Sequence, residues 1–145
     1  MSLTGTLKRN YETTFEIDTS DTSTPSWAQL KGFTNFSKAM NEVVEQFAFL
    51  DENGWGRSEV VGAQPTVTLT GKRLVGDTAQ DFIFAKQYGS FGDRHVSYKM
   101  TKDGKVLTGD CTLANIDDGG GDAQALDEVS VTIHFNGAPT ITNAQ

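Results

Sequence analysis

GAQPTVTLTGKRLVGDTAQDFI, residues 62–83, is the stretch of this sequence that decides the fold. In its first half, Val67 and Leu69 alternate with three threonines, which is the period-two pattern of a half-buried strand rich in β-branched residues. The basic turn Gly71-Lys72-Arg73 then interrupts the alternation. The stretch therefore predicts a strand that ends in a glycine-containing turn.

The second half of the stretch carries the start signals of a helix. A glycine, an N-cap and a first helical residue follow one another, and these are Gly76, Asp77 and Thr78. Asp81 stands three residues after Thr78, close to a capping box. Lys86 suits the negative end of the helix dipole, and Gly89 suits a C-cap. We therefore predict one helix over about residues 78–88.

Length and composition favour one mainly β domain. A chain of 145 residues has the usual length of one domain and can bury a substantial core. Fifteen Gly, three Pro, and many Thr and Val favour a β-rich chain with tight turns over a helical bundle. The single cysteine, Cys111, excludes an intramolecular disulfide and a thiolate zinc cage, so we expect it to be a small core residue.

Charge and hydropathy argue against several classes of function. The formal net charge of -7 argues against a conventional nucleic-acid binder, which needs a basic surface to neutralise phosphates. No apolar run is long enough to span a bilayer, and residues 1–15 lack the hydrophobic core of a signal peptide. We therefore expect a soluble protein, made in the cytoplasm, without membrane association.

Two blocks of the chain carry a recognisable pattern. The first joins Thr70–Arg73 to Gly76–Ile83, and the second is VTIHFNGAP over Val131–Pro139. Both blocks resemble the major tail tube proteins of long-tailed, siphovirus-type bacteriophages, which are related to the type VI secretion tube protein. The resemblance covers the chain from about Trp27 onward. It implies a β-sandwich or barrel of two packed antiparallel sheets with one flanking helix, in a single domain over residues 1–145.

The N-terminal part combines a short strand with polar segments. Residues 11–17 alternate Tyr11, Thr13, Phe15 and Ile17 with polar residues, which predicts a strand with one apolar side. The polar run 18–26 is a solvated loop or an arm ordered by a neighbouring molecule. Residues 1–26 together are a possible N-terminal arm and loop.

Residues 36–50 fit two patterns. The local spacing of apolar residues favours a helix, whereas the family resemblance favours strand character toward Phe49, and we adopt the strand. Residues 51–54 predict a turn, and the stretch to Gln64 predicts a long loop with Trp55 as its large apolar group. Trp55 is either an interface anchor or a side chain that packs over its own domain's edge.

The C-terminal half predicts three strands. Residues 95–100 and 105–113 form a β-hairpin around the turn 101–104. An acidic, glycine-rich segment over 115–128 precedes the clearest alternation of the chain, over 129–135. Asn136-Gly137 predicts a turn, and the tail beyond it either frays or reaches a partner.

Candidate catalytic and ligand-binding motifs each lack a required residue. A calcium loop over 115–126 has Leu126 where a bidentate Glu is needed. A phosphate loop has Thr66 at its first glycine position and Arg73 at its Ser/Thr position, and a dinucleotide fingerprint has Glu59 at its third glycine position. We therefore predict no catalytic, cofactor-binding or metal-binding residues, and no cofactor.

The remaining polar motifs have plain explanations. His95 and His134 lie on polar faces of separate predicted strands and are interpreted as exposed strand histidines. Asn35-Phe36-Ser37 matches a glycosylation acceptor, but without a secretory signal we attribute it to chance. An enzyme is therefore the weakest of the functional hypotheses.

Amphipathic strands with unpaired edges favour self-association, because a closed ring satisfies every edge. The resemblance implies hexameric rings that stack into a tail tube, located in the virion and made in the host bacterium. Polar strand faces would line the channel, and DNA would pass without specific binding. The expected partners are further copies of the chain, a tape-measure protein and tail-tip or tail-terminator proteins.

We assign ring-to-ring contacts to the N-terminal arm and the loop 51–64, with Trp55, Arg57 and Glu59 as interface residues. The family motif at the helix start comprises six residues: Gly71, Lys72, Arg73, Gly76, Asp77 and Thr78. One alternative is a subunit of a type VI secretion tube or a phage-tail-like bacteriocin. Another is a monomeric ligand-binding β-sandwich that uses Trp27, Trp55 and Tyr88 as stacking platforms.

Overall fold

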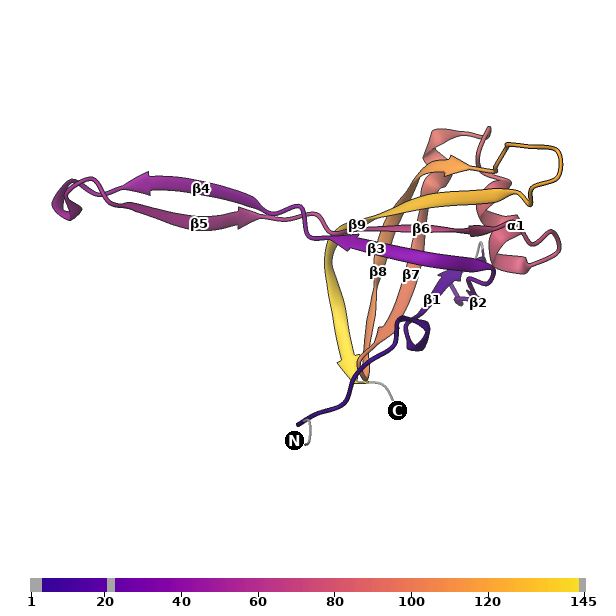
Figure 1. The fold of residues 1–145 in the computed structure, drawn as a ribbon, viewed down its shortest axis with the longest axis horizontal. Helices are drawn as coiled ribbons and strands as arrows, with labels where there is room; N and C mark the ends of the chain where they lie inside the picture. Colours follow the sequence, from indigo (N-terminus) through magenta and orange to yellow (C-terminus); the bar gives the residue numbers. More distant parts are fainter. Residues whose placement is uncertain (1–3, 21–22, 144–145) are drawn as a thin grey trace.

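A computed structural model describes residues 4–20 and 23–143, and its body is one antiparallel sheet that curls around a hydrophobic core (Figure 1). The strand order is β2-β1-β7-β8-β9-β6-β3. The strands of this sheet are β1 (Thr14–Asp18), β2 (Trp27–Gln29), β3 (Phe33–Ala39), β6 (Thr66–Lys72), β7 (His95–Lys102), β8 (Lys105–Asp117) and β9 (Glu128–Asn143).

Two further strands form a separate hairpin, and one short helix flanks the sheet. The hairpin consists of β4 (Val43–Ala48) and β5 (Gly56–Gly62), and the α-helix is α1 (Thr78–Phe84). The described residues also contain three short 3-10 helices: Asn10–Glu12, Leu50–Glu52 and Phe91–Arg94. The mainly β fold with one flanking helix is therefore confirmed.

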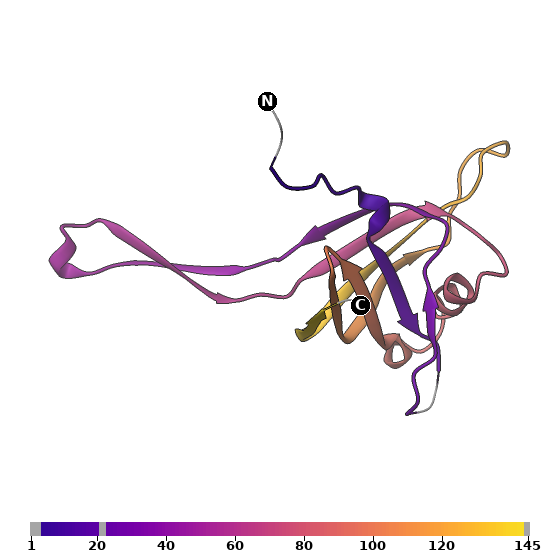
Figure 2. The ribbon, with the colours of Figure 1, turned by 90° about the horizontal axis from the view of Figure 1, so that it is seen from below.

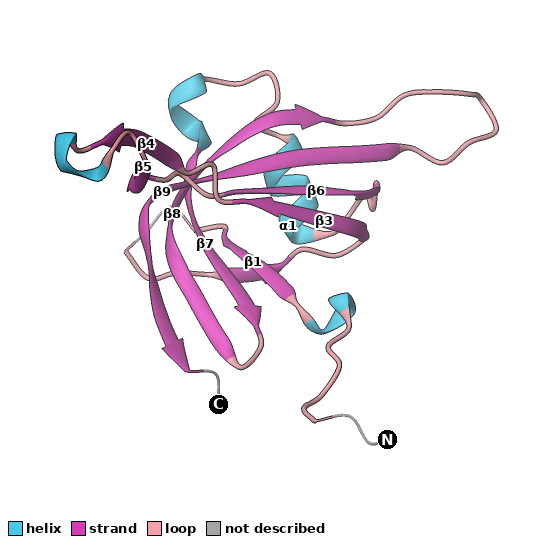
Figure 3. Ribbon diagram, turned by 60° about the vertical axis from the view of Figure 1, so that its left-hand side comes forward, coloured by secondary structure: helices cyan, strands magenta, loops and turns pink. Residues whose placement is uncertain are grey.

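The curl of the sheet comes from an irregularity in its two longest strands (Figure 3). Thr108 pairs with Thr140, but Asp110 pairs with Asn136, so the β9 segment 137–139 lies opposite a single β8 residue. Gly137 has a φ of 86°, which favours glycine. Such a bulge bends the strand, and the two layers of the predicted sandwich thus come from one bent sheet.

This bulge corrects two predictions for the C-terminus. Asn136-Gly137 does not make a chain-reversing turn, because β9 continues through it and pairs with β8 again from Thr140 to Asn143. The described part of the tail is therefore a strand of the sheet. The hairpin of β7 and β8 is confirmed, with a two-residue turn at Asp103 and Gly104, whose φ angles are 55° and 77°.

The core follows the predicted alternation. Every second residue of β6 is buried, as are the corresponding positions of β9 from Val129 to Phe135. Ala79 and Ile83 of α1 are fully buried in the same cluster. Cys111 is also fully buried, which confirms its assignment to the core.

The helix is shorter than predicted. α1 ends at Phe84, so Lys86 and Gly89 lie beyond it. The amides of Lys86 and Gln87 donate to the carbonyls of Ile83 and Phe84, three residues back, so the chain continues in tight turns rather than an α-helix. Asp77 is the N-cap, as predicted, and its carboxylate accepts the amide of Gln80.

The N-terminal strand begins later than predicted. Tyr11 lies in a 3-10 turn and is exposed, so the alternation holds only over β1. At the end of β1, the carboxylate of Asp18 accepts the amides of Ser20 and Ser26, both at 2.9 Å. The Ser26 contact is the main cause that lowers the pKa of Asp18 below its ordinary value. Asp18 thus holds Ser20 and Ser26 of the predicted loop close to the end of β1, and residues 21 and 22 lie outside the described residues.

Residues 36–50 contain strands, which confirms the strand interpretation over the local helical pattern. β3 pairs with β6 across the sheet, and this tertiary pairing overrides the helical spacing. The predicted loop 51–64 is wrong over Gly56–Gly62, which is strand β5. Only Leu50–Glu52 and the following turn connect the two strands of this hairpin.

Candidate functional site

The hairpin of β4 and β5 projects far from the body of the molecule (Figures 1 and 2). We call residues 43–62 the arm. It leaves the body between the end of β3 and the start of β6, where the side-chain amide of Asn41 donates to the carbonyl of Gln64 and the hydroxyl of Thr66. A two-stranded hairpin is at best marginally stable in water without further packing. The arm is therefore the part of the molecule that most requires a partner.

The two faces of the arm differ in chemistry. One face is uncharged and carries three cross-strand pairs: Val44 with Val60, Gln46 with Ser58, and Ala48 with Gly56. The opposite face carries Glu45 paired with Glu59, and Phe47 paired with Arg57. Most of these side chains are exposed, including Val44 at 49% and Val60 at 56%. Neither face of the arm packs against a hydrophobic core within the described residues.

The tip of the arm is held by local contacts. Phe47 and Phe49 pack edge to face with ring centroids 5.2 Å apart, and the Arg57 guanidinium lies 5.7 Å from the centre of the Phe49 ring. Arg57 also forms an ion pair with Glu52. Trp55 stands at the tip and is 78% exposed. These contacts fix the shape of the tip without burying it.

The predicted interface residues thus all lie in the arm. Arg57 and Glu59 share one face of β5, and Trp55 precedes that strand at the tip. Their contact with another molecule stays a prediction. Sequence reasoning did not single out Glu45, because its position opposite Glu59 is visible only once β4 and β5 are seen to pair in this register.

A second notable surface is the polar face of the sheet. Thr68 of β6 lies opposite Thr132 of β9, with their hydroxyl oxygens 3.4 Å apart. Farther along the sheet, His95, Thr112 and His134 lie in register across β7, β8 and β9. Both histidines lie on polar strand faces, as predicted, but His134 is half-buried and only His95 is exposed; the Thr112 hydroxyl lies 3.2 Å from Nδ1 of His95. No cluster of three His, Cys, Asp or Glu residues suited to a metal occurs among the described residues.

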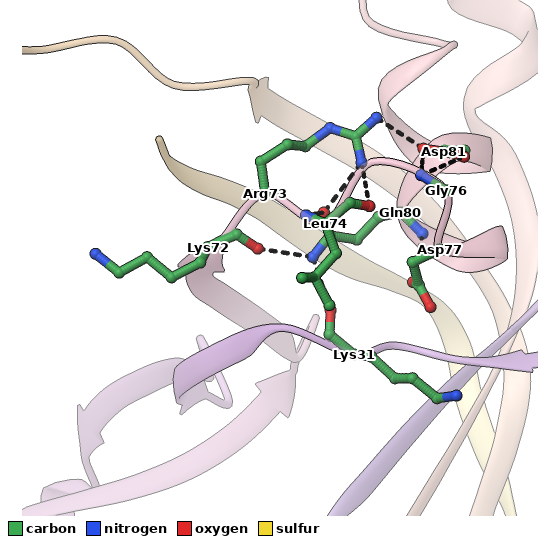
Figure 4. Close-up of polar contacts among 8 residues, drawn as sticks. All are labelled: Lys31, Lys72, Arg73, Leu74, Gly76, Asp77, Gln80 and Asp81. Carbon is green, nitrogen blue, oxygen red and sulfur yellow. Dashed lines mark hydrogen bonds and ion pairs between the residues drawn. The ribbon is translucent and has the colours of Figure 1, made fainter. Parts of the chain in front are cut away.

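The predicted motif around Gly71 to Thr78 braces the helix against the sheet (Figure 4). Its centre is Gln80, which is fully buried. The Gln80 amide nitrogen donates to the carbonyls of Lys31 at 2.7 Å and Lys72 at 2.9 Å. Its amide oxygen accepts the N–H of Leu74 at 2.9 Å and Nη1 of Arg73 at 3.2 Å. One side chain therefore links α1, the end of β6 and the β2–β3 connection.

The charged residues of the motif are neutralised inside the same chain. Arg73 forms a 2.8 Å ion pair with Asp81, and this hydrogen bond lowers the pKa of Asp81 below its ordinary value. Asp81 also accepts the amide of Gly76. Lys72 pairs with Glu128 at 2.8 Å and lowers the pKa of that carboxyl. These residues act structurally and leave no free basic group for a phosphate.

Gly71 has a separate structural role. A Cβ at this position would fall on the backbone of Gly32 and Phe33 in the chain that leads into β3. Sequence reasoning placed Gly71 in a turn, whereas it lies within β6 at a close backbone approach. Sequence reasoning also missed Gln80, although a Gln three residues after an N-cap Asp is a known helix-start signal.

The structure argues against a compact binding site for a small ligand. A surface hollow of about 590 Å³ is lined mainly by polar groups, among them Asp18, Lys86 and Asp93. Trp27 packs against Lys99, at 4.5 Å from its ammonium, whereas Trp55 is at the tip of the arm and Tyr88 follows α1. The three predicted stacking platforms therefore do not form one site.

The one α-helix of the described residues is too short to span a bilayer.

Comparison with known proteins gives a match at the level of fold. No protein-family model matches the chain, and no curated protein matches its sequence. The tail of an empty gene transfer agent particle, computed by helical refinement with C6 symmetry, matches with a TM-score of 0.76 and 13% identity. That match covers 94% of this chain and 99% of the other.

Two further solved structures have the same fold. The SPP1 tail tube matches with a TM-score of 0.61 and 12% identity, over 92% of this chain and 77% of that chain. The cap that terminates the tube of the anti-feeding prophage matches with a TM-score of 0.59 and 15% identity, over 99% and 96%. The chain therefore has the fold of these tail and tube proteins. This fold agrees with the family resemblance that its sequence shows.

Proposed function

We propose that this chain is the structural subunit of a phage-type tail tube, in which copies form rings that stack into a hollow tube. The observation that carries the proposal is the arm, a solvent-exposed hairpin that projects from a domain with a tail-tube fold. A monomer has no use for such an extension, because its two uncovered faces cost stability in water. Contact with neighbouring copies covers both faces.

Ring closure uses the margins of the curled sheet. β3 pairs only with β6 among the described strands, so its outer edge is unpaired. The end of β9, from Thr140 to Asn143, pairs with β8 but has no described strand on its other side, because the pairing of β9 with β6 ends at His134. Open edges of this kind suit pairing with neighbouring copies in a cyclic assembly. Six subunits per ring agree with the C6 symmetry of the gene transfer agent tail.

The tube conducts DNA from the capsid to the host without binding it specifically. The hydroxyl-rich sheet face around Thr68 and Thr132 offers no cation for a phosphate, and Lys72 at its margin is already paired with Glu128. The net charge of -7 further reduces electrostatic capture of the phosphate backbone. The subunit is not an enzyme and needs no cofactor in this function.

Stacked rings do not close on themselves, so other proteins must set the length of the tube. We expect a tape-measure protein and tail-tip or tail-terminator proteins as partners. The protein then resides in the tail of the virion after synthesis in the host cytoplasm. The arm, with Trp55, Arg57 and Glu59, and the N-terminal residues before β1 provide the ring-to-ring contacts.

A tube of a secretion system or a bacteriocin is the second candidate. The match to the cap of the anti-feeding prophage tube is the observation that favours it. The subunit architecture is the same in both cases. Imaging of native particles distinguishes them, since a phage tail ends at a DNA-filled capsid.

Assembly of the purified chain tests the proposal. We expect negative-stain images to show rings or rods, and sedimentation to show a matching heavy species that grows with protein concentration. Deletion of residues 53–60, which removes the tip and most of β5, should abolish rods and leave the body folded by circular dichroism. A chain that stays monomeric at every concentration, and is not incorporated into tubes nucleated by native tail tips, would refute the proposal.

A further inference from the structure

The charged face of the arm contains an unfavourable pair. Glu45 and Glu59 are directly opposite each other on β4 and β5, and both are exposed. Like charges directly opposite in an antiparallel pair destabilise the hairpin. No described cation forms an ion pair with either carboxylate, whereas the nearby Arg57 is occupied by Glu52. The isolated arm therefore carries a repulsion that a cation from another molecule would relieve.

The opposite end of the molecule has the complementary chemistry. The arm extends from the end of β3, whereas Lys31 precedes the start of that strand. Leu74 and Val75 follow the end of β6 and lie at the same end, because β3 and β6 are antiparallel. The Leu74 side chain lies over Gly32, the neighbour of Lys31. We call these three residues, Lys31, Leu74 and Val75, the far end.

The far end presents one free cation beside exposed apolar groups. Lys31 is exposed and belongs to none of the ion pairs of the described residues, and its ammonium points away from the Gln80 network (Figure 4). Val75 is 86% exposed and Leu74 is 43% exposed. The arm offers the matching groups, because the exposed carboxylates of Glu45 and Glu59 stand beside the half-buried ring of Phe47 on its charged face.

We propose that the charged face of the arm docks on the far end of a second copy, with Lys31 of that copy between Glu45 and Glu59. This inference rests on the proposed function and identifies the residues of its ring-to-ring contact. Joining opposite ends of two copies is a heterologous contact, which repeats along a fibre axis as stacking requires. Lys31 relieves the carboxylate repulsion, and Val75 and Leu74 cover apolar groups of the arm.

Lys38 is the matched alternative cation. It is also exposed and without an ion pair among the described residues, but it lies on β3 near the base of the arm. A head-to-tail contact cannot bring the base of one arm to the charged face of another arm that points the same way. Lys38→Glu is therefore the control for the charge change itself.

A charge-swap experiment tests the docking. Lys31→Glu alone and Glu59→Lys alone should each lower the yield of sedimented tubes about tenfold at low salt, because each leaves like charges in contact. The combined variant should recover most of the wild-type yield, and Lys38→Glu should retain it. Thermal unfolding of the unassembled variants separates these effects from misfolding. Glu59→Gln provides the second measurement, since it should leave the folded monomer as stable or more stable while still lowering tube yield.

The outcomes separate this inference from the proposed function. Wild-type tubes that persist in Lys31→Glu, or a combined variant no better than either single one, overturn the docking and leave the tube intact as a proposal. Rescue by pairing Glu59→Lys with Lys38→Glu instead overturns the assignment to the far end. A wild-type chain that forms no tube under any nucleating condition overturns the proposed function and the docking with it.

Discussion

Replacing Gln80 by Glu tests whether one buried amide holds the helix to the sheet. The substitution keeps the size of the side chain and its acceptor oxygen but removes the nitrogen that donates to the carbonyls of Lys31 and Lys72. Both carbonyls then face a carboxylate oxygen in a fully buried site. The change therefore removes two hydrogen bonds and introduces repulsion without altering the packing volume.

The structure sets the expected magnitude. A buried polar group left without its partner costs about 1–3 kcal/mol, so two carbonyls cost roughly 2–6 kcal/mol. Arg73, whose Nη1 lies 3.2 Å from the acceptor oxygen, offsets part of this cost. We expect a net loss of about 3 kcal/mol, which corresponds to a fall in Tm of roughly 10 °C for a domain of this size.

Thermal and urea unfolding followed by circular dichroism measure this loss. Gln87→Glu is the matched control, because it adds the same charge just beyond α1, at a half-buried side chain outside the network. The control should change the free energy of unfolding by no more than about 0.5 kcal/mol. If Gln80→Glu loses no more stability than Gln87→Glu, the buried amide does not brace the helix and the reasoning fails.

Three further predictions follow from the same geometry. Gly71→Ala should unfold at a temperature several degrees lower than wild type, because the added Cβ falls on backbone that cannot move aside. Gly92→Ala, at an uncrowded exposed position, should keep the wild-type Tm. Equal Tm values for the two variants would contradict the close approach at Gly71. The thiol of Cys111 should not react with a thiol reagent in the native protein at pH 8, because it is buried and burial raises its pKa to about 12. The same thiol should react fully in denaturant. Rapid labelling of the native protein would show that the core is open. The Arg73 contact lowers the folded-state pKa of Asp81, so the stability it contributes is present above the ordinary carboxyl pKa and is lost as pH falls through the folded value. In urea unfolding between about pH 5 and 3, the free energy of unfolding should therefore fall less in Asp81→Asn than in wild type. Parallel pH curves for the two proteins would disprove the linkage.

Local sequence signals predicted the elements whose faces are defined inside this chain. β6 and the first half of β9 each bury every second residue, and that burial is what the alternation records. The N-cap at Asp77 was likewise readable, because capping is a local interaction. Gln80 was not, since its partners include the carbonyl of Lys31, which is 49 residues away in sequence. A polar residue on the buried side of a short helix acquires a meaning only from the fold.

The bulge in β9 shows the same limit at the level of the backbone. Asn-Gly is a strong signal for a hairpin turn when two strands of similar length flank it. Here the strand on the far side pairs with β8, the same neighbour that pairs with the near side, so the glycine bends one strand instead of joining two. Whether Asn136-Gly137 forms a hairpin turn or a bulge depends on the length of β8, which runs from Lys105 to Asp117 and offers partners on both sides of the bend.

The failure to predict β5 has a different cause, and it bears on function. Residues 56–62 show no alternation of apolar and polar side chains, because neither face of this strand is buried within the molecule. Period-two patterning arises when one face meets a core and the other meets water. A strand that lacks this pattern, yet pairs along most of its length in a long projecting hairpin, has its sequence set by something other than its own core. The pair Glu45 and Glu59 supports the same conclusion, since a hairpin selected for its own stability would not place two carboxylates opposite each other. The arm therefore has the pattern expected of half of an interface, and the charge-swap variants test whether the far end of another copy is the other half.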